Sequence, residues 1–151
     1  MHTATNELYI DRKIDVLVIY SNCTGEISGR SLILLKENYK ELEELKAAYK
    51  NLCDKDLIIL GFVHWYFPKD LLNNPIVAIL PIKGNQEKIE LHPIMWGIKD
   101  LYLATKNIST PIKIAFPSLP QNSCLSLGKF NELLKNQYKN SKHKSILYLV
   151  L

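Results

Sequence analysis

The sequence predicts an α/β fold, a three-layer α/β/α sandwich with a mostly parallel central sheet. Short apolar runs rich in β-branched residues alternate along the chain with longer segments whose apolar side chains recur at helical spacing. Strands and helices that alternate in this way form parallel sheets covered by helices, joined by right-handed crossovers. A chain of 151 residues is long enough to bury its own core, so we expect one domain over residues 1–151.

The first half of the chain supplies the first strands and helices. Residues 14–20 (IDVLVIY) are a near-continuous apolar run, typical of a strand buried on both faces. Residues 29–37 and 42–52 carry apolar side chains at helical spacing between charged ones, which predicts one broken helix or two short helices. Residues 57–67 form a second apolar run and predict a strand, in which Gly61 marks a bulge.

The second half continues the alternation. A turn at residues 74–75 (Asn-Pro) precedes the next strand, which ends at Pro81, and Pro93 suits the first turn of a helix. The expected elements are a strand at 76–80, a helix carrying Ile94, Ile98, Leu101 and Tyr102, a strand at 112–116, a helix carrying Phe130, Leu133, Leu134 and Tyr138, and a strand at 146–151.

Composition and charge narrow the class of protein. Hydrophobic residues make up 47% and charged residues 23% of the chain, as in ordinary globular proteins. The amino terminus lacks the features of a signal peptide, and no apolar run approaches the roughly 20 residues that span a bilayer. We therefore expect a cytoplasmic protein with no membrane contact. The net charge of +4 suits an anionic ligand, but the basic residues form no clustered stripe of the kind that binds nucleic acid.

The three cysteines indicate neither a disulfide framework nor a metal site. Cys23, Cys53 and Cys124 form no even set and no C-x-x-C pair. Free thiols are typical of a reducing compartment. We expect no metal and no cofactor.

Two loops are the candidate ligand site. In parallel α/β sheets, ligands bind beyond the carboxyl ends of the strands, where loops lead into helices. The first loop, residues 21–30 (SNCTGEISGR), follows the first strand, and the second loop, residues 117–128 (PSLPQNSCLSLG), follows the strand at 112–116. Each can direct backbone N–H groups and a helix dipole at a phosphate. The two loops together predict a site for an anionic ligand.

Three segments, in order, resemble the motifs of one family. Residues 14–36 (IDVLVIYSNCTGEISGRSLILLK) resemble D-A-L-V-N-x-V-N-x-x-G-V-M-G-K-G followed by an apolar helix, with Asp15, Asn22 and Gly25 matching directly. Residues 74–83 (NPIVAILPIK) resemble N-P-x-x-I-I-N-F-P-T-K, and residues 113–119 (KIAFPSL) resemble S-I-A-I-P-P-L. These are motifs of macro domains, particularly of the branch of ADP-ribosyl-DNA hydrolases and ADP-ribose 1''-phosphate processing proteins. The resemblance extends over about residues 6–151.

The resemblance implies ADP-ribose or a derivative as ligand and gives roles to individual residues. Asn22 is implied as the residue that orients the distal ribose or the attacking water, and Glu7 lies near the position of the family's adenine-reading aspartate. The ligand-binding residues expected from the amino terminus and the two loops are Glu7, Asn22, Cys23, Gly25, Ser28, Gly29, Arg30, Ser118, Gln121, Asn122 and Ser123.

The sequence also departs from the family's pattern at both loops. The family's Gly-Lys-Gly run is replaced by Ser28-Gly29-Arg30, and the catalytic lysine of some DNA-deribosylating members has no equivalent. The glycine-rich second loop of the family, G-C-G-x-G-G-L, is replaced by PQNSCLS at residues 120–126. Glycine allows a close backbone approach to phosphate, whereas proline restricts the backbone. Because hydrolysis needs tighter placement of reacting atoms than affinity does, these changes favour binding over turnover.

Three functions remain open. The first is binding or sequestration of an ADP-ribose-derived nucleotide, such as a signalling nucleotide of host defence if the protein comes from a phage, where it would act against that defence. The second is hydrolysis of ADP-ribosyl linkages or of a 1''-phosphate, with nucleic acid entering only as an ADP-ribosylated substrate. The third is a protein-interaction module whose pocket is vestigial.

Several of these residues also have a plainer structural interpretation. Asn22 suits the cap of a turn before a helix, because asparagine side chains bond to nearby backbone groups. Cys23 would be nucleophilic only if a helix terminus lowered its pKa, and no histidine partner is identified. Arg30 suits a solvated position in a first helical turn, and His64 and Trp65 suit packing within a strand.

Overall fold

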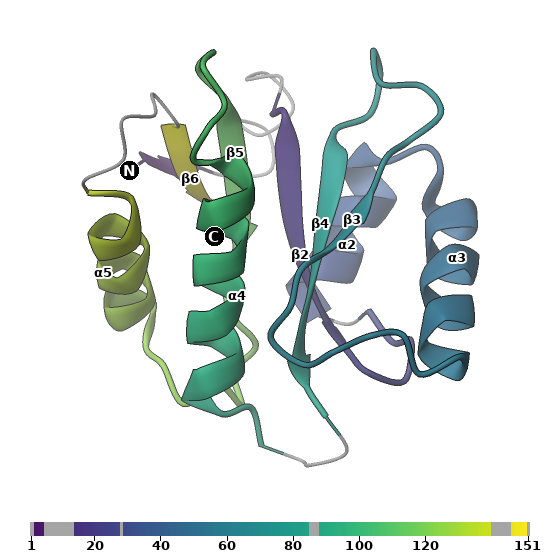
Figure 1. Cartoon of the computed structure of the whole chain (residues 1–151), viewed down its shortest axis with the longest axis horizontal. Coiled ribbons are helices and arrows are strands. Elements are labelled where there is room, and N and C mark those ends of the chain that lie inside the picture. Colours follow the sequence, from purple (N-terminus) through teal and green to yellow (C-terminus); the bar gives the residue numbers. More distant parts are fainter. Residues whose placement is uncertain (1, 5–13, 28, 85–87, 140–145, 151) are drawn as a thin grey trace.

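A mostly parallel sheet forms the middle layer of the protein. The computed structural model describes residues 2–4, 14–27, 29–84, 88–139 and 146–150. Over these residues the chain forms, in order, β1 (His2–Ala4), β2 (Val16–Asn22), α2 (Gly29–Asn38), α3 (Leu42–Asp54), β3 (His64–Tyr66), β4 (Ile76–Lys83), α4 (Leu91–Thr105), β5 (Lys113–Pro117), α5 (Leu127–Tyr138) and β6 (Ile146–Val150) (Figure 1).

The order of the strands confirms the parallel topology. The described strands form one six-stranded sheet in the order β1-β6-β5-β2-β4-β3. β2 lies at its centre and pairs in parallel with both β4 and β5, and β5 and β1 pair in parallel with β6. β3 is antiparallel to β4 and forms one edge of the sheet. The carboxyl ends of β2, β4 and β5 therefore point the same way.

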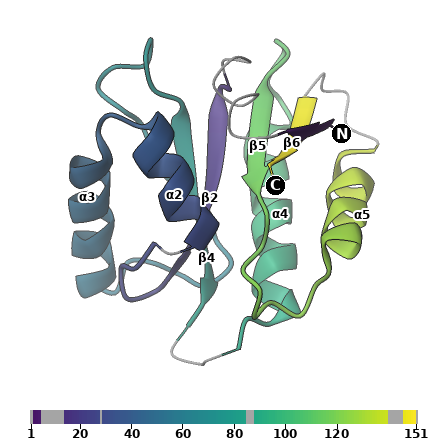
Figure 2. The same cartoon turned by 180° about the vertical axis from the view of Figure 1, so that it is seen from behind.

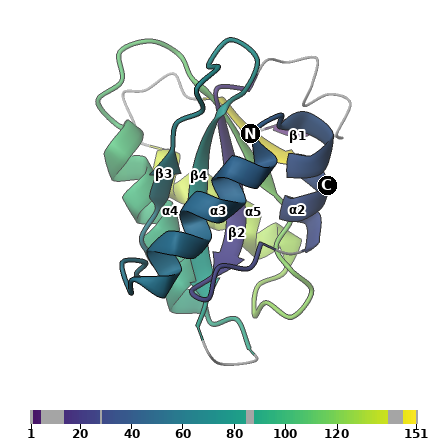
Figure 3. The ribbon, with the colours of Figure 1, turned by 90° about the vertical axis from the view of Figure 1, so that its right-hand side faces the viewer.

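Alternate residues of β2 face two different layers of helices. Leu17 and Ile19 pack with side chains of α2 and α3, whereas Val16, Val18 and Tyr20 pack with side chains of α4 and α5. Figures 1 and 2 show these two faces of the sheet. In Figure 3, α4 and α2 lie on opposite sides of β4 and β2. The predicted three-layer α/β/α sandwich is confirmed.

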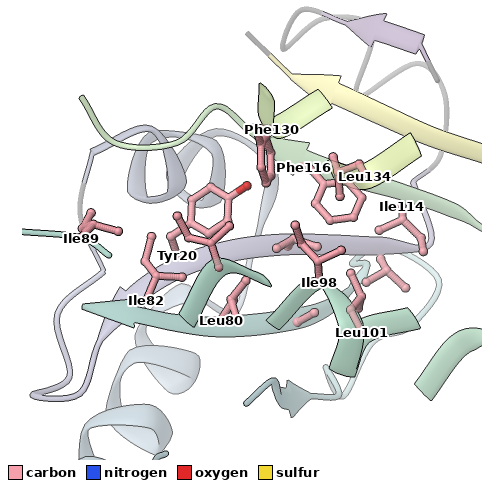
Figure 4. Close-up of a cluster of buried hydrophobic side chains, with 14 residues drawn as sticks. Tyr20, Leu80, Ile82, Ile89, Ile98, Leu101, Ile114, Phe116, Phe130 and Leu134 are labelled. Carbon is pink, nitrogen blue, oxygen red and sulfur yellow. The ribbon is translucent and has the colours of Figure 1, made fainter. Parts of the chain in front are cut away.

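Aromatic rings dominate the core between the sheet and α5. Phe130 of α5 lies edge-on to Tyr20 of β2 and to Phe116 of β5, with ring centroids 6.4 Å and 6.3 Å away. Figure 4 shows these rings with the aliphatic side chains of β4 and α4 around them. Edge-to-face contacts at these separations stabilise aromatic pairs beyond the burial of their area. The cluster fixes α5, and with it the end of the second loop, to the sheet.

The prediction of a long strand at residues 57–67 is wrong. Only β3 (His64–Tyr66) is a strand, and the residues before it form an irregular segment with a turn at residues 60–61. Gly61 adopts a φ of +82° and donates its N–H to the carbonyl of Pro81 at 2.8 Å. Val63 donates to a carboxylate oxygen of Asp100 at 2.8 Å. Because these backbone groups bond outside the sheet, the apolar run joins it only at its end, and Gly61 belongs to a turn and not to a bulge.

β4 is longer than the sequence predicts. The strand was expected to end at Pro81, yet it continues to Lys83. β3 pairs with β4 only between Val77 and Ile79. Residue 81 therefore does not have to donate a backbone N–H to β3, and proline, which has no N–H, fits there. The carbonyl of Pro81 accepts from the N–H of Gly61 at 2.8 Å. Proline is therefore tolerated, and the strand carries Lys83 to the carboxyl end of the sheet.

The sequence does not predict β1, which pairs with β6 at an edge of the sheet. The remaining elements agree with the sequence to within two or three residues at each end. The predicted broken helix is two helices, α2 and α3, and Pro93 lies in the first turn of α4. Among the described residues, no helix is both long and apolar enough to cross a membrane.

Candidate functional site

A pocket opens at the carboxyl ends of β2 and β4. It is a small hollow that is open to solvent. Its lining residues are Tyr20, Ser21, Asn22, Glu26, Ile82, Lys83, Ile89, Pro120 and Asn122. Figure 4 shows three of them, Tyr20, Ile82 and Ile89, at one end of the sheet.

Both loops predicted from the sequence contribute to this pocket. Asn22 and Glu26 come from the first loop, and Pro120 and Asn122 come from the second loop. A β-bridge between Ile89 and a residue of the second loop joins that loop to the segment that precedes α4. The pocket therefore lies where ligands bind in parallel α/β sheets.

The side chain of Asn22 organises the first loop from within. Its Oδ1 accepts hydrogen bonds from the backbone N–H of Thr24 at 3.0 Å, the hydroxyl of Thr24 at 2.8 Å and the backbone N–H of Glu26 at 2.9 Å. Its Nδ2 donates to Oε2 of Glu26 at 3.1 Å. The plainer interpretation of Asn22, a cap of its own turn, is thus seen directly. Its amide oxygen is saturated by the loop.

Helix α3 holds the first loop in place. The hydroxyl of Tyr49 donates to the backbone carbonyl of Asn22 at 2.9 Å and lies 2.6 Å from Oγ of Ser21. Burial raises the pKa of Tyr49, so its hydroxyl keeps its proton and remains a donor. Gly25 has a φ of +102°, and a Cβ there would lie 2.6 Å from Cδ of Lys50. The first loop is therefore packed closely against Tyr49 and Lys50 of α3.

Cys23 is half-buried and does not line the pocket. Its backbone N–H donates to the carbonyl of Lys83 at 3.1 Å, which joins the first loop to the end of β4. Burial raises the pKa of its thiol, and the neighbouring Cys53 raises it further. Since the thiolate is the reactive form, these surroundings oppose a nucleophilic role.

Arg30 and Gly29 begin α2 and lie outside the pocket lining. Arg30 is half-buried in the first helical turn. The next residue, Ser31, accepts a hydrogen bond on its hydroxyl from the backbone N–H of Tyr20 at 2.9 Å, which holds the start of α2 against β2. The roles predicted for Arg30 and Gly29 remain predictions. Glu7 and Ser28 lie outside the described residues.

The second loop is folded by its own hydrogen bonds. Ser123 donates its N–H to the carbonyl of Pro120 at 3.0 Å and its hydroxyl to the carbonyl of Leu125 at 3.2 Å. Ser126 caps α5 by accepting from the N–H of Lys129 at 3.3 Å. The serine hydroxyls are thus used within the loop.

Of the four second-loop residues expected to bind ligand, the structure brings one to the pocket. Asn122 lines the pocket, whereas Ser118, Gln121 and Ser123 do not. Gln121 is exposed, and Ser118 is half-buried beside the end of β5. The ligand contacts predicted for these three side chains remain predictions.

Lys83 is the pocket residue of most chemical interest that sequence reasoning did not select. It is half-buried at the end of β4 and lines the pocket. Within the described lining, it is the cation and Glu26 is the carboxylate. The sequence did contain a signal for Lys83. It ends the segment NPIVAILPIK, which resembles N-P-x-x-I-I-N-F-P-T-K, and both segments end in lysine.

Tyr20 was also missed, because its run of apolar neighbours marks it as core. Its ring packs in the core and its hydroxyl donates to the carbonyl of Pro117 at 2.7 Å. Burial raises its pKa well above the ordinary value, so the hydroxyl remains a donor. Tyr20, which lines the pocket, therefore also binds the first residue of the second loop, Pro117. Among the described residues, no group of three or more histidine, cysteine or acidic side chains is placed to hold a metal ion.

The capping role of Asn22 leads to a stability prediction. We expect Asn22→Ala to lower the free energy of unfolding by about 1 to 2 kcal/mol, because the backbone donors of the loop lose their acceptor. Asn122→Ala, at an exposed position, should change it by less than about 0.5 kcal/mol. Chemical denaturation of both variants measures the difference. Equal stability of Asn22→Ala and the parent chain would contradict the capping role.

Solved structures share this fold, although no family model matches the sequence and no curated protein matches it. The macrodomain of Mycobacterium tuberculosis DarG superposes with a TM-score of 0.74 at 20% identity, over 92% of this chain and 91% of that one. The macrodomain of Thermus aquaticus DarG superposes with a TM-score of 0.77 at 14% identity, over 99% and 97%. Thermosipho africanus DarTG, solved in complex with ADP-ribose, gives 0.69 at 15% identity, over 91% of this chain and 38% of that one.

These superpositions cover almost the whole of the chain. The three-layer sandwich with a mostly parallel sheet therefore superposes as a whole on these macrodomains. The protein has the macrodomain fold, in a divergent sequence. The resemblance found in the sequence is confirmed at the level of the fold.

Proposed function

We propose that this protein binds ADP-ribose or a nucleotide derived from it, in the pocket between the first and second loops. The observation that carries the proposal is the position of Lys83, a cation that lines a pocket at the carboxyl ends of β2 and β4. The complex of Thermosipho africanus DarTG with ADP-ribose, a protein of similar fold, supports the choice of ligand.

The pocket offers groups that suit each part of such a nucleotide. The ammonium of Lys83 suits a phosphate, because charge-assisted hydrogen bonds are stronger than neutral ones. Glu26 and Asn122 supply acceptors and amide groups for ribose hydroxyls or a base. Ile82, Ile89 and Pro120 supply apolar surface. The lining thus combines a majority of polar side chains with a smaller apolar part, which suits a ligand that has both charged and uncharged groups.

Two features favour binding over hydrolysis. The amide oxygen of Asn22 already accepts three hydrogen bonds from the first loop, so it is a poor candidate to orient an attacking water. Pro120 lines the pocket where the family has glycine, and it restricts how closely the backbone approaches a ligand. Hydrolysis depends on closer placement of the reacting atoms than binding does. We propose that the protein sequesters its nucleotide in the cytoplasm, acting against host defence if its source is a phage.

The proposal predicts that ADP-ribose stabilises the folded protein. A ligand at 100 times its dissociation constant adds about 2.7 kcal/mol to the free energy of unfolding. For a domain of this size, each kcal/mol corresponds to roughly 2 to 4 °C in melting temperature. Thermal denaturation with ADP-ribose, its cyclic and adducted relatives, and AMP as a control measures the shift. No shift with any ADP-ribose derivative would favour the protein-interaction module.

The same samples distinguish sequestration from turnover. We expect the ligand to be recovered intact and in stoichiometric amount after the protein is denatured, as measured by chromatography. ADP-ribosylated DNA, ADP-ribosylated protein and ADP-ribose 1''-phosphate should likewise persist. Multiple turnovers of any of these to free ADP-ribose would establish a hydrolase instead.

A further inference from the structure

The pocket is lined by a carboxylate as well as by a cation. Glu26 and Lys83 both line the pocket, from the first loop and from the end of β4 respectively. The salt bridge found among the described residues is between Lys50 and Asp54, so Glu26 and Lys83 are not within 4 Å of one another as an ion pair. Each charge is therefore presented to a ligand separately.

The carboxylate of Glu26 is exposed, and a hydrogen bond from the first loop orients it. Asn22 Nδ2 donates to its Oε2 at 3.1 Å. The backbone of Glu26 is fixed by the same residue, since its N–H donates to Asn22 Oδ1 at 2.9 Å and its carbonyl accepts from the N–H of Asn22 at 3.1 Å. Asn22 is in turn bonded through its carbonyl to the buried hydroxyl of Tyr49. The negative charge thus has a defined position on the pocket wall.

A fixed carboxylate discriminates strongly between ligand groups. It repels a phosphate, and it accepts hydrogen bonds from the hydroxyls of a sugar, which donate without bringing negative charge. A ligand that places its diphosphate near Lys83 therefore has to place an uncharged, hydroxyl-bearing part against Glu26.

We infer that Glu26 is a specificity-determining residue, which makes the pocket select a nucleotide with free sugar hydroxyls over the same nucleotide with a phosphate on that sugar. The inference rests on the proposed function. It narrows the ligand class to ADP-ribose forms whose ribose beside Glu26 carries hydroxyls or another uncharged hydrogen-bond donor, and it places phosphorylated forms among the rejected ligands.

The experiment compares three nucleotides that differ by one phosphate. Dissociation constants are measured calorimetrically for ADP-ribose, ADP-ribose 1''-phosphate and ADP-ribose 2'-phosphate. We expect one phosphorylated form to bind at least about tenfold more weakly than ADP-ribose, the size expected for one unfavourable charge contact near solvent. Using both phosphorylated forms identifies which ribose lies beside Glu26.

Glu26→Gln removes the charge and keeps the shape and an acceptor for Asn22. In this variant the ratio between the affinities for ADP-ribose and for the rejected form should fall about tenfold relative to the parent, whatever happens to the affinity for ADP-ribose itself. Glu132→Gln, at an exposed position on α5 outside the pocket, changes the net charge equally and should leave the ratio of the affinities unchanged. In the parent chain, raising the salt concentration should narrow the same ratio, because salt screens the repulsion, and this needs no variant.

The possible failures are distinct. An unchanged ratio in Glu26→Gln, or an equal change in Glu132→Gln, would overturn the role of Glu26 while ADP-ribose binding by the parent chain still supports the proposed function. A parent chain that binds none of the three nucleotides would overturn the proposed function itself, and the specificity inference with it.

Discussion

Phe130→Ala should lower the free energy of unfolding by about 3 to 5 kcal/mol, the largest stability loss that we expect from a single substitution. Phe130 is 1% exposed and its ring contacts the rings of Tyr20 and Phe116 edge-on. Alanine removes both aromatic contacts and leaves a cavity between α5 and the sheet. Because native domains are stable by only about 5 to 15 kcal/mol, this loss is a large part of the total.

Thermal and urea denaturation measure this loss. For a domain of this size the melting temperature should fall by roughly 6 to 20 °C. Leu127→Ala is the matched control, because Leu127 is an apolar residue of the same helix but is 46% exposed. It should cost less than about 1 kcal/mol. Similar losses in the two variants would show that the aromatic cluster does not fix α5 as the structure indicates.

The sequence predicts the sheet well where burial on both faces leaves a continuous apolar signal. β2 is central, and its faces contact two separate cores, so residues 16–20 show no alternation and are recognised as a parallel strand. The run at residues 57–67 has the same apolar character but a different cause. Leu57 and Ile59 are each 61% exposed, and Gly61 turns the chain before β3 begins. Hydrophobicity alone does not distinguish these two cases.

The loops of the site were predictable, because the position of a ligand follows from parallel topology alone. The roles of the individual side chains in these loops were harder to predict. Asparagine both caps turns and binds ligands, and only the contacts of Asn22 with Thr24 and Glu26 show the first role. Pro81 hid Lys83, because a proline suggests the end of a strand. β4 continues past Pro81 because β3 pairs with it only as far as Ile79, which leaves that side without ladder bonds.

The position of the pocket predicts that Lys83 matters more for binding than Arg30 does. Lys83→Met keeps the aliphatic length of the side chain and removes the charge, so a lost charge-assisted bond to phosphate should weaken ADP-ribose binding by about 1.5 to 3 kcal/mol, or roughly 10- to 150-fold. The backbone carbonyl of Lys83, which accepts from Cys23, is unaffected by the change. The melting temperature without ligand should therefore stay close to that of the parent.

Arg30→Met is the comparison that locates the anion site. Arg30 lies in the first turn of α2 and does not line the pocket, so its loss should weaken binding by only about threefold, the effect of one more distant charge in solvent. Titration calorimetry of both variants with ADP-ribose gives the ranking. If Arg30→Met instead loses 10- to 150-fold and Lys83→Met loses little, the phosphate binds at the start of α2, as the resemblance to the family's first loop implies. The pocket at the end of β4 would then hold another part of the ligand.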